Sequence, residues 1–174
     1  YVLYSGSDCK ATSSGKITGL GTLSIDSIGS MTQMDGTIDV NTLWITASKP
    51  ANAIVPTTYD SANVRIYNRD SGTDRTWAPS AGTYTFTGNV IFAGSTLTTY
   101  TIDNATNNPN FVFKGNVTIE NTTSALIWTK GTGTITFSGT SAQTADFLDK
   151  SVEDIVISNT SASVSLLTNG VTTD

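Results

Sequence analysis

Apolar and polar residues alternate in several short stretches of the chain, a pattern typical of half-buried β-strands. In 82–88 threonine alternates with aromatic residues, and 133–139 repeats this alternation with isoleucine and phenylalanine. Successive side chains of a strand point to opposite faces, so we expect the threonines to face solvent. The residues predicted to point into a core are Tyr84, Phe86, Ile135 and Phe137.

The first part of the chain has less regular strand-like alternation, in 17–28 and 36–46. We interpret 1–46 as degenerate strands or a capping element, and 47–62, which holds two of the four prolines, as a loop or boundary. Residues 63–174 are interpreted as a series of repeated strands. Because no stretch shows the apolar stripe of an amphipathic helix, the sequence predicts an all-β protein.

Short phrases recur along the later part of the chain. Residues 86–90 (FTGNV) and 113–117 (FKGNV) are nearly identical and lie 27 residues apart, and 137–139 (FSG) follows 24 residues later. A unit of 24–27 residues built from short strands and Gly/Asn turns is typical of one coil of a parallel β-helix, or β-solenoid. A β-sandwich also has alternating strands and frequent turns, and it is the alternative fold.

The composition supports strands and excludes several classes of function. Threonine, serine and asparagine make up 65 of the 174 residues, and the branched side chain of threonine favours strands. With 9 basic and 14 acidic residues, we expect no nucleic-acid partner. The absence of histidine excludes His-based triads and the usual zinc sites, and we expect no cofactor.

Neither the single cysteine nor the apolar runs indicate a disulfide or a membrane span. Cys9 has no second cysteine to pair with, and the longest purely apolar runs are far shorter than a membrane-spanning helix. The chain starts at Tyr1 rather than Met, so we expect a removed leader or a fragment of a longer protein. Together with the composition, this predicts an extracellular or cell-surface location.

One long phrase resembles a known class of proteins. Residues 133–144 (GTGTITFSGTSAQT), followed by 154–159 (DIVISN), look like the Thr/Gly/Asn-rich repeats of secreted bacterial surface proteins of the adhesin type. The resemblance covers about residues 82–174 and implies a parallel β-helix in a surface structure. Similar coils occur in phage tail fibres and tailspikes, so a place on a virion surface is an alternative.

Asparagines recur at one position of the repeat, two residues after an isoleucine. This position is occupied by Asn68, Asn104, Asn121 and Asn159. The N-x-S/T pattern for glycosylation is met at Asn104, Asn116, Asn121 and Asn159. Because the repeated position includes Asn68, which lacks that pattern, we favour an asparagine ladder that bonds neighbouring turns.

Two tryptophans, Trp77 and Trp128, occupy equivalent positions 51 residues apart. If exposed, they are candidates for a platform that stacks on sugar rings. If buried, they are core residues, which is the interpretation we favour.

Four acidic residues lie close together in the sequence: Asp146, Asp149, Glu153 and Asp154. Carboxylates of this density are candidate Ca²⁺ ligands, or a carboxylate pair for glycoside hydrolysis. Because all four belong to one irregular segment without a counterpart in other repeats, we favour a solvated loop.

These observations predict a non-enzymatic extracellular structural or adhesive module, such as a subunit of a surface filament or fibre that associates end to end. The alternatives are a carbohydrate-binding module or carbohydrate-active β-helix, with a polysaccharide or host surface as partner, and a phage tail-fibre or capsid-associated protein. A Thr-x-Thr array is also a feature of ice-binding solenoids, but Lys114 is expected to interrupt it here.

Overall fold

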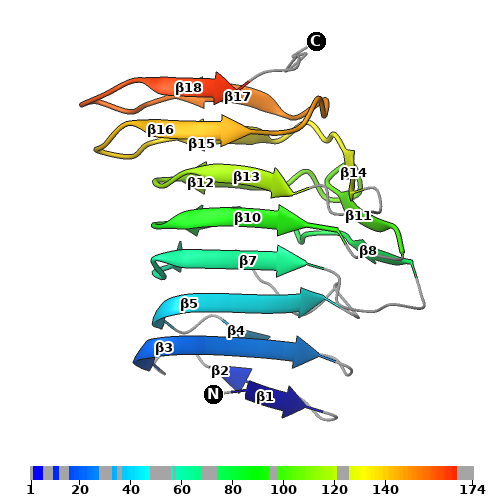
Figure 1. Cartoon of the computed structure of the whole chain (residues 1–174). Coiled ribbons are helices and arrows are strands. Elements are labelled where there is room, and N and C mark those ends of the chain that lie inside the picture. The colour runs from blue at the N-terminus through cyan, green and yellow to red at the C-terminus, as the bar shows by residue number, and fades with distance from the viewer. Residues whose placement is uncertain are drawn as a thin grey trace.

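The computed structural model shows a protein whose described residues form strands and loops without a helix (Figure 1). It describes residues 2–5, 10–11, 16–27, 33–34, 37–47, 56, 58–67, 74–94, 98–120 and 126–167, with few side chains before residue 56. The prediction of an all-β protein is confirmed.

The strands of the described residues are short after residue 58 and long before it. They are β1 (Val2–Ser5), β2 (Lys10–Ala11), β3 (Lys16–Ser27), β4 (Gln33–Met34), β5 (Thr37–Ala47), β6 (Thr58–Tyr59), β7 (Asn63–Tyr67), β8 (Arg75–Trp77), β9 (Thr83–Phe86), β10 (Asn89–Ala93), β11 (Tyr100–Asp103), β12 (Asn110–Phe113), β13 (Val117–Glu120), β14 (Leu126–Thr129), β15 (Thr134–Phe137), β16 (Gln143–Asp146), β17 (Asp154–Ile157) and β18 (Val164–Leu167).

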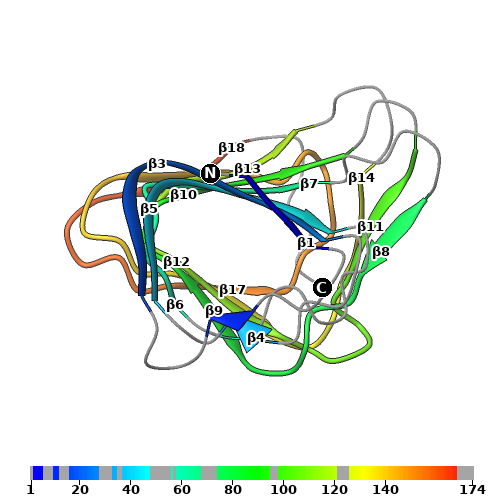
Figure 2. The same ribbon diagram turned by 90° about the horizontal axis from the view of Figure 1, so that it is seen from below.

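Successive coils stack so that equivalent strands form flat faces (Figures 1 and 2). The first face contains β6, β9, β12, β15 and β17, and the second contains β7, β10, β13, β16 and β18. A smaller third face contains β8, β11 and β14. The long strand β5 turns from one face to the other, because Ile38 pairs with Tyr59 of β6 while Thr42–Thr46 pair with β7.

Every strand pair in the described residues is parallel, as in a β-solenoid. The solenoid prediction is therefore confirmed, and the β-sandwich alternative is wrong, because sandwiches are built from antiparallel sheets. Coil length agrees with the predicted 24–27 residues on the first face, where Phe113 pairs with Phe86 and Phe137. It is shorter at the end, where Asp154 pairs with Thr134, 20 residues earlier.

The strands of the first part of the chain belong to the same sheet as the later coils. β3 and β5 occupy 16–27 and 37–47, close to the predicted 17–28 and 36–46, and β5 pairs with β7 in register. Within 47–62, the structure places β6, which joins β5 to β9. The sheet is thus continuous from β1 to β18.

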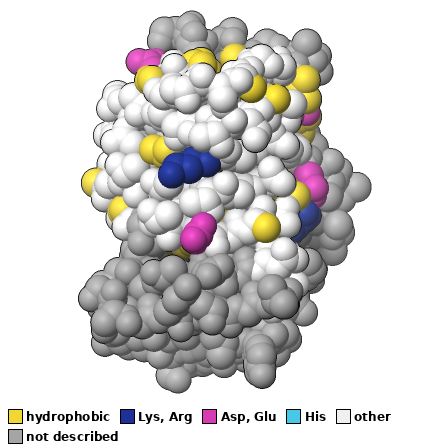
Figure 3. Space-filling model, turned by 90° about the vertical axis from the view of Figure 1, so that its left-hand side faces the viewer, with side chains coloured by type: hydrophobic (Ala, Val, Ile, Leu, Met, Phe, Trp, Pro, Cys, Tyr) yellow, Lys and Arg dark blue, Asp and Glu magenta, His cyan; other side chains and the backbone are white. Residues whose placement is uncertain are grey.

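The predicted inward and outward positions are those observed on the first face. Tyr84, Phe86, Ile135 and Phe137 are all fully buried. The alternating threonines of β9 and β15 are exposed or half-buried, and the surface at this side carries few charged atoms (Figure 3).

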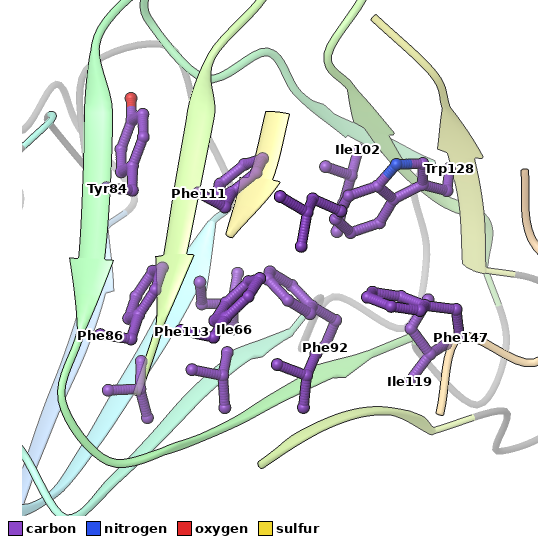
Figure 4. Close-up of a cluster of buried hydrophobic side chains, with 14 of the residues drawn as sticks. Ile66, Tyr84, Phe86, Phe92, Ile102, Phe111, Phe113, Ile119, Trp128 and Phe147 are labelled. Atoms are coloured by element: carbon purple, nitrogen blue, oxygen red, sulfur yellow. The ribbon is translucent and has the colours of Figure 1, made fainter. Parts of the chain in front are cut away.

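Aromatic rings stack from coil to coil in the core (Figure 4). Phe86 stands between Tyr59 and Phe113, with ring centroids 5.1 Å and 5.6 Å apart, and Phe113 lies 5.9 Å from Phe137. Such stacked and offset pairs add to the free energy gained by removing the rings from water. One coil cannot bury these rings alone, so each coil depends on its neighbours.

Candidate functional site

The two tryptophans lie on the third face, one coil apart on either side of β11. Trp77 and Trp128 both pair with Ile102, and their side chains are 0% and 7% exposed. Trp128 packs against Phe92 and Phe147, with ring centroids 5.3 Å and 6.2 Å away. A sugar platform needs an exposed ring face, so this alternative is corrected, and both residues are core residues.

Glu153 is a buried carboxyl group that ties two coils together. Its Oε2 accepts a hydrogen bond of 2.9 Å from Nε1 of Trp128, and its Oε1 accepts one of 2.9 Å from the backbone N–H of Gly131. Its side chain is 0% exposed. The interpretation of this residue as part of a solvated loop is therefore wrong, because both oxygens replace water with protein donors.

The other three acidic residues point to separate surroundings. Asp146, in β16, accepts the backbone N–H of Leu148, and Asp149 is exposed with a φ of 60°. Asp154 lies at the surface, 3.9 Å from Nζ of Lys130. Within the described part of the chain, no group of three or more acidic or cysteine side chains is placed to hold a metal ion. The candidate Ca²⁺ site and the carboxylate pair are not assembled.

The candidate glycosylation sites differ in the accessibility of the side-chain nitrogen. Asn104 is fully buried, and Nδ2 of Asn159 donates to the carbonyl of Ser141 and to Oε1 of Gln143. Asn116 is half-buried, and Asn121 lies outside the described residues. Because a glycan is attached through Nδ2, Asn116 is the most accessible of the described candidates.

An asparagine ladder is present, but at a different repeat position from the predicted one. Nδ2 of Asn89 donates to Oδ1 of Asn63, and Oδ1 of Asn89 accepts the backbone N–H of Asn116. Oδ1 of Asn116 then accepts the N–H of Thr144. These residues begin strands of the second face, whereas Asn104 and Asn159 follow strands, and Asn68 and Asn121 lie outside the described residues. The signal for this ladder was the recurring Gly-Asn-Val phrase.

Gln143 was not singled out from the sequence, yet it connects three coils. Its Nε2 donates to the carbonyls of Phe113 and Gly115, at 3.0 Å and 2.8 Å. Its Oε1 accepts the N–H of Gly139 and the side chain of Asn159. The side chain is 1% exposed, so it replaces the water that these buried groups would otherwise need. A single glutamine at the start of a strand gives no sequence signal for this role.

The outward row of threonines on the first face is interrupted as predicted. Val112 lies between Thr85 and Thr136, and the backbone N–H of Lys114 bonds to the carbonyl of Phe86, which places the exposed lysine next to Thr87. A charged side chain therefore lies within the Thr-x-Thr array.

The resemblance to secreted surface proteins agrees with the structure at the level of an all-strand, parallel fold. In the described part of the chain, no helix is both long and apolar enough to cross a membrane. Comparison of the chain with protein-family models, with curated proteins and with solved structures found no match.

Proposed function

We propose that this chain is a non-enzymatic structural or adhesive module of an extracellular or cell-surface assembly. The observation that carries the proposal is the interior, which is filled by stacked side chains, while the sequence candidates for chemistry serve the packing. Trp77, Trp128 and Glu153 are all buried in contacts between coils. The structure uses its most reactive side chains to hold coils together.

The outer surface supports the same role. Thr, Ser and Asn occupy much of it, only 13% of the residues are charged, and neighbouring coils are joined by backbone and asparagine bonds along the solenoid. A repetitive, weakly charged surface on a rigid rod suits a spacer or an adhesive face. A subunit of a filament or fibre with end-to-end contacts is the form that this module takes in the proposal.

The proposal is tested by combining imaging with a carbohydrate screen. Negative-stain images of the purified chain should show rods or joined rods, and incubation with a panel of polysaccharides should release no reducing sugar. A reducing-sugar signal that disappears in Asp146→Asn or Asp149→Asn would overturn the non-enzymatic assignment. Binding to a polysaccharide without cleavage would support an adhesive module.

A further inference from the structure

The last described coil exposes side chains at positions that earlier coils bury. Ile157 pairs with Phe137 and continues its inward column, but Ile157 is 53% exposed, whereas Phe137 is fully buried. Leu166 pairs in the same way with Ala145 and is 42% exposed, whereas Ala145 is buried. The core is therefore open at β17 and β18.

Outward positions of the same two strands are also apolar. Val156 is 42% exposed and Leu167 is 47% exposed. Among the side chains that the structure describes, the exposed large hydrophobic residues are these four and Ile127, on the third face. Figure 3 shows apolar atoms gathered toward the end of the molecule where this coil lies. Concentration of apolar surface at one end marks a contact surface.

The backbone of this coil is also open to pairing. β17 and β18 are the two terminal strands of the sheet in the described residues, each with one neighbour, β15 and β17's counterpart β16. An edge strand presents unpaired N–H and C=O groups, which most proteins protect with charges or proline. Residues 155–167 contain no charged residue and no proline.

We infer that this end surface, formed by β17 and β18, binds the same end of a second copy of the chain. A partner has to offer two strands at once, because β17 and β18 lie on different faces (Figure 2). It also has to bring apolar side chains to cover Ile157 and Leu166. The same end of a second copy meets both requirements in a two-fold, tail-to-tail arrangement with antiparallel edges.

The charge distribution favours a copy of the chain over a charged partner. Because residues 155–167 are uncharged, two such surfaces meet without like-charge repulsion, while a charged partner finds no opposite charge there. The inference goes beyond the proposed function, since a pair of solenoids forms in solution whether or not the module works at a cell surface.

The first test measures association of the 174-residue chain by sedimentation over a range of concentrations. The wild-type chain should form dimers, and Leu167→Lys should raise the dissociation constant at least about tenfold, because two lysines would be buried per dimer. Ile127→Lys is the matched control, with a similar exposed fraction away from the end surface, and it should dimerise like the wild type. Circular dichroism confirms that both variants are folded.

The second test uses a single thiol to identify which ends meet. In a Cys9→Ser background, Leu167→Cys should form covalent dimers with a short bis-maleimide, because only a tail-to-tail contact brings two copies of this residue together. Ile127→Cys in the same background should stay monomeric under these conditions. A chain that is monomeric at every concentration, an open series of larger oligomers, or equal cross-linking of both variants would overturn the inference.

Discussion

The backbone of the neighbouring coil dictates glycine at the corner between the first and second faces. A Cβ placed on Gly115 would lie 2.4 Å from backbone atoms of Gly88, and one on Gly88 would lie 2.2 Å from the carbonyl oxygen of Ser61. Backbone atoms cannot move aside as the end of a side chain can, so a methyl group has to separate two coils.

We therefore predict that Gly115→Ala lowers the free energy of unfolding by about 1–3 kcal/mol, the usual cost of overpacking. The control is Gly21→Ala, because a Cβ on Gly21 meets nothing within 4 Å, and this variant should match the wild type. Urea unfolding of both variants is the measurement. Equal stability of the two variants would show that the corner can widen without cost.

The carboxyl group of Glu153 leads to a second prediction. Glu153→Gln replaces one acceptor oxygen by an NH₂ group, so either Trp128 or Gly131 loses its acceptor, and stability should fall by about 1–3 kcal/mol. Asp154→Asn, on the next residue, removes only a surface contact to Lys130 and should change stability by less than about 1 kcal/mol. Thermal unfolding that ranks the two variants in the opposite order would contradict this role of Glu153.

Buried tyrosines predict sensitivity to alkali. Burial raises the pKa of Tyr84 from 10.0 to about 12, partly offset by hydrogen bonds to Ser80, and burial raises the pKa of Tyr100 still further. The folded state therefore favours the neutral phenols, so their contribution to stability is complete below pH 10 and is lost as the pH rises toward 12. Phenolate absorbance should appear together with unfolding in the wild type, and Tyr84→Phe with Tyr100→Phe should move the transition to higher pH.

Sequence patterns identified core residues better than polar contacts. Alternation placed Phe86 and Phe137 correctly, because the direction of a strand side chain depends only on its neighbours. Glu153 was misplaced because its partner, Trp128, is 25 residues away and belongs to the previous coil. Which asparagines form the ladder also depends on register between coils, which a strand-by-strand interpretation does not contain.

At the scale of elements, the aromatic columns set the cohesion between coils. Phe113 lies at the centre of one column, fully buried, with rings of Phe86, Phe92, Phe111 and Phe137 within 6.4 Å. Removal of this ring leaves a cavity that the regular ladder around it cannot close without breaking strand register.

Phe113→Ala should accordingly lower stability by about 3–5 kcal/mol, the range for a buried phenylalanine. Val112→Thr, on the same strand but pointing outward, should cost less than about 1 kcal/mol, since its side chain is only half-buried. Chemical denaturation compares the two. A Phe113→Ala chain as stable as Val112→Thr would mean that the column does not hold the coils.

The elements themselves were largely predictable, because both alternation and repetition are local. The ends of β3 and β5 differ from the predicted ranges by one residue. Their continuity over two faces was not predicted, since no Gly-Asn turn divides them as Gly88 and Asn89 divide β9 from β10. Coil length varied because loops outside the faces, such as that between β17 and β18, are free to differ.

At the scale of the whole molecule, repetition predicts stacking but does not predict where stacking stops. Each coil contributes its own inward side chains and an interface with its neighbours, so stability is greatest where a coil has a neighbour on both sides. Coils around β9, β10, β12 and β13 have two such neighbours, whereas β17 and β18 have one in the described residues.

Hydrogen exchange should therefore follow position along the solenoid. At low concentration, the backbone amides of β12 and β13 should exchange slowest, while those of β17 and β18 should exchange fastest, because local opening of the last coil exposes little additional apolar surface. Raising the protein concentration should slow exchange in β17 and β18 alone if these strands meet a second copy, and Leu167→Lys should abolish that change while leaving β12 and β13 unaffected. Uniform exchange along the solenoid would contradict the coil-by-coil picture, and concentration-independent exchange in β18 would contradict the tail-to-tail contact.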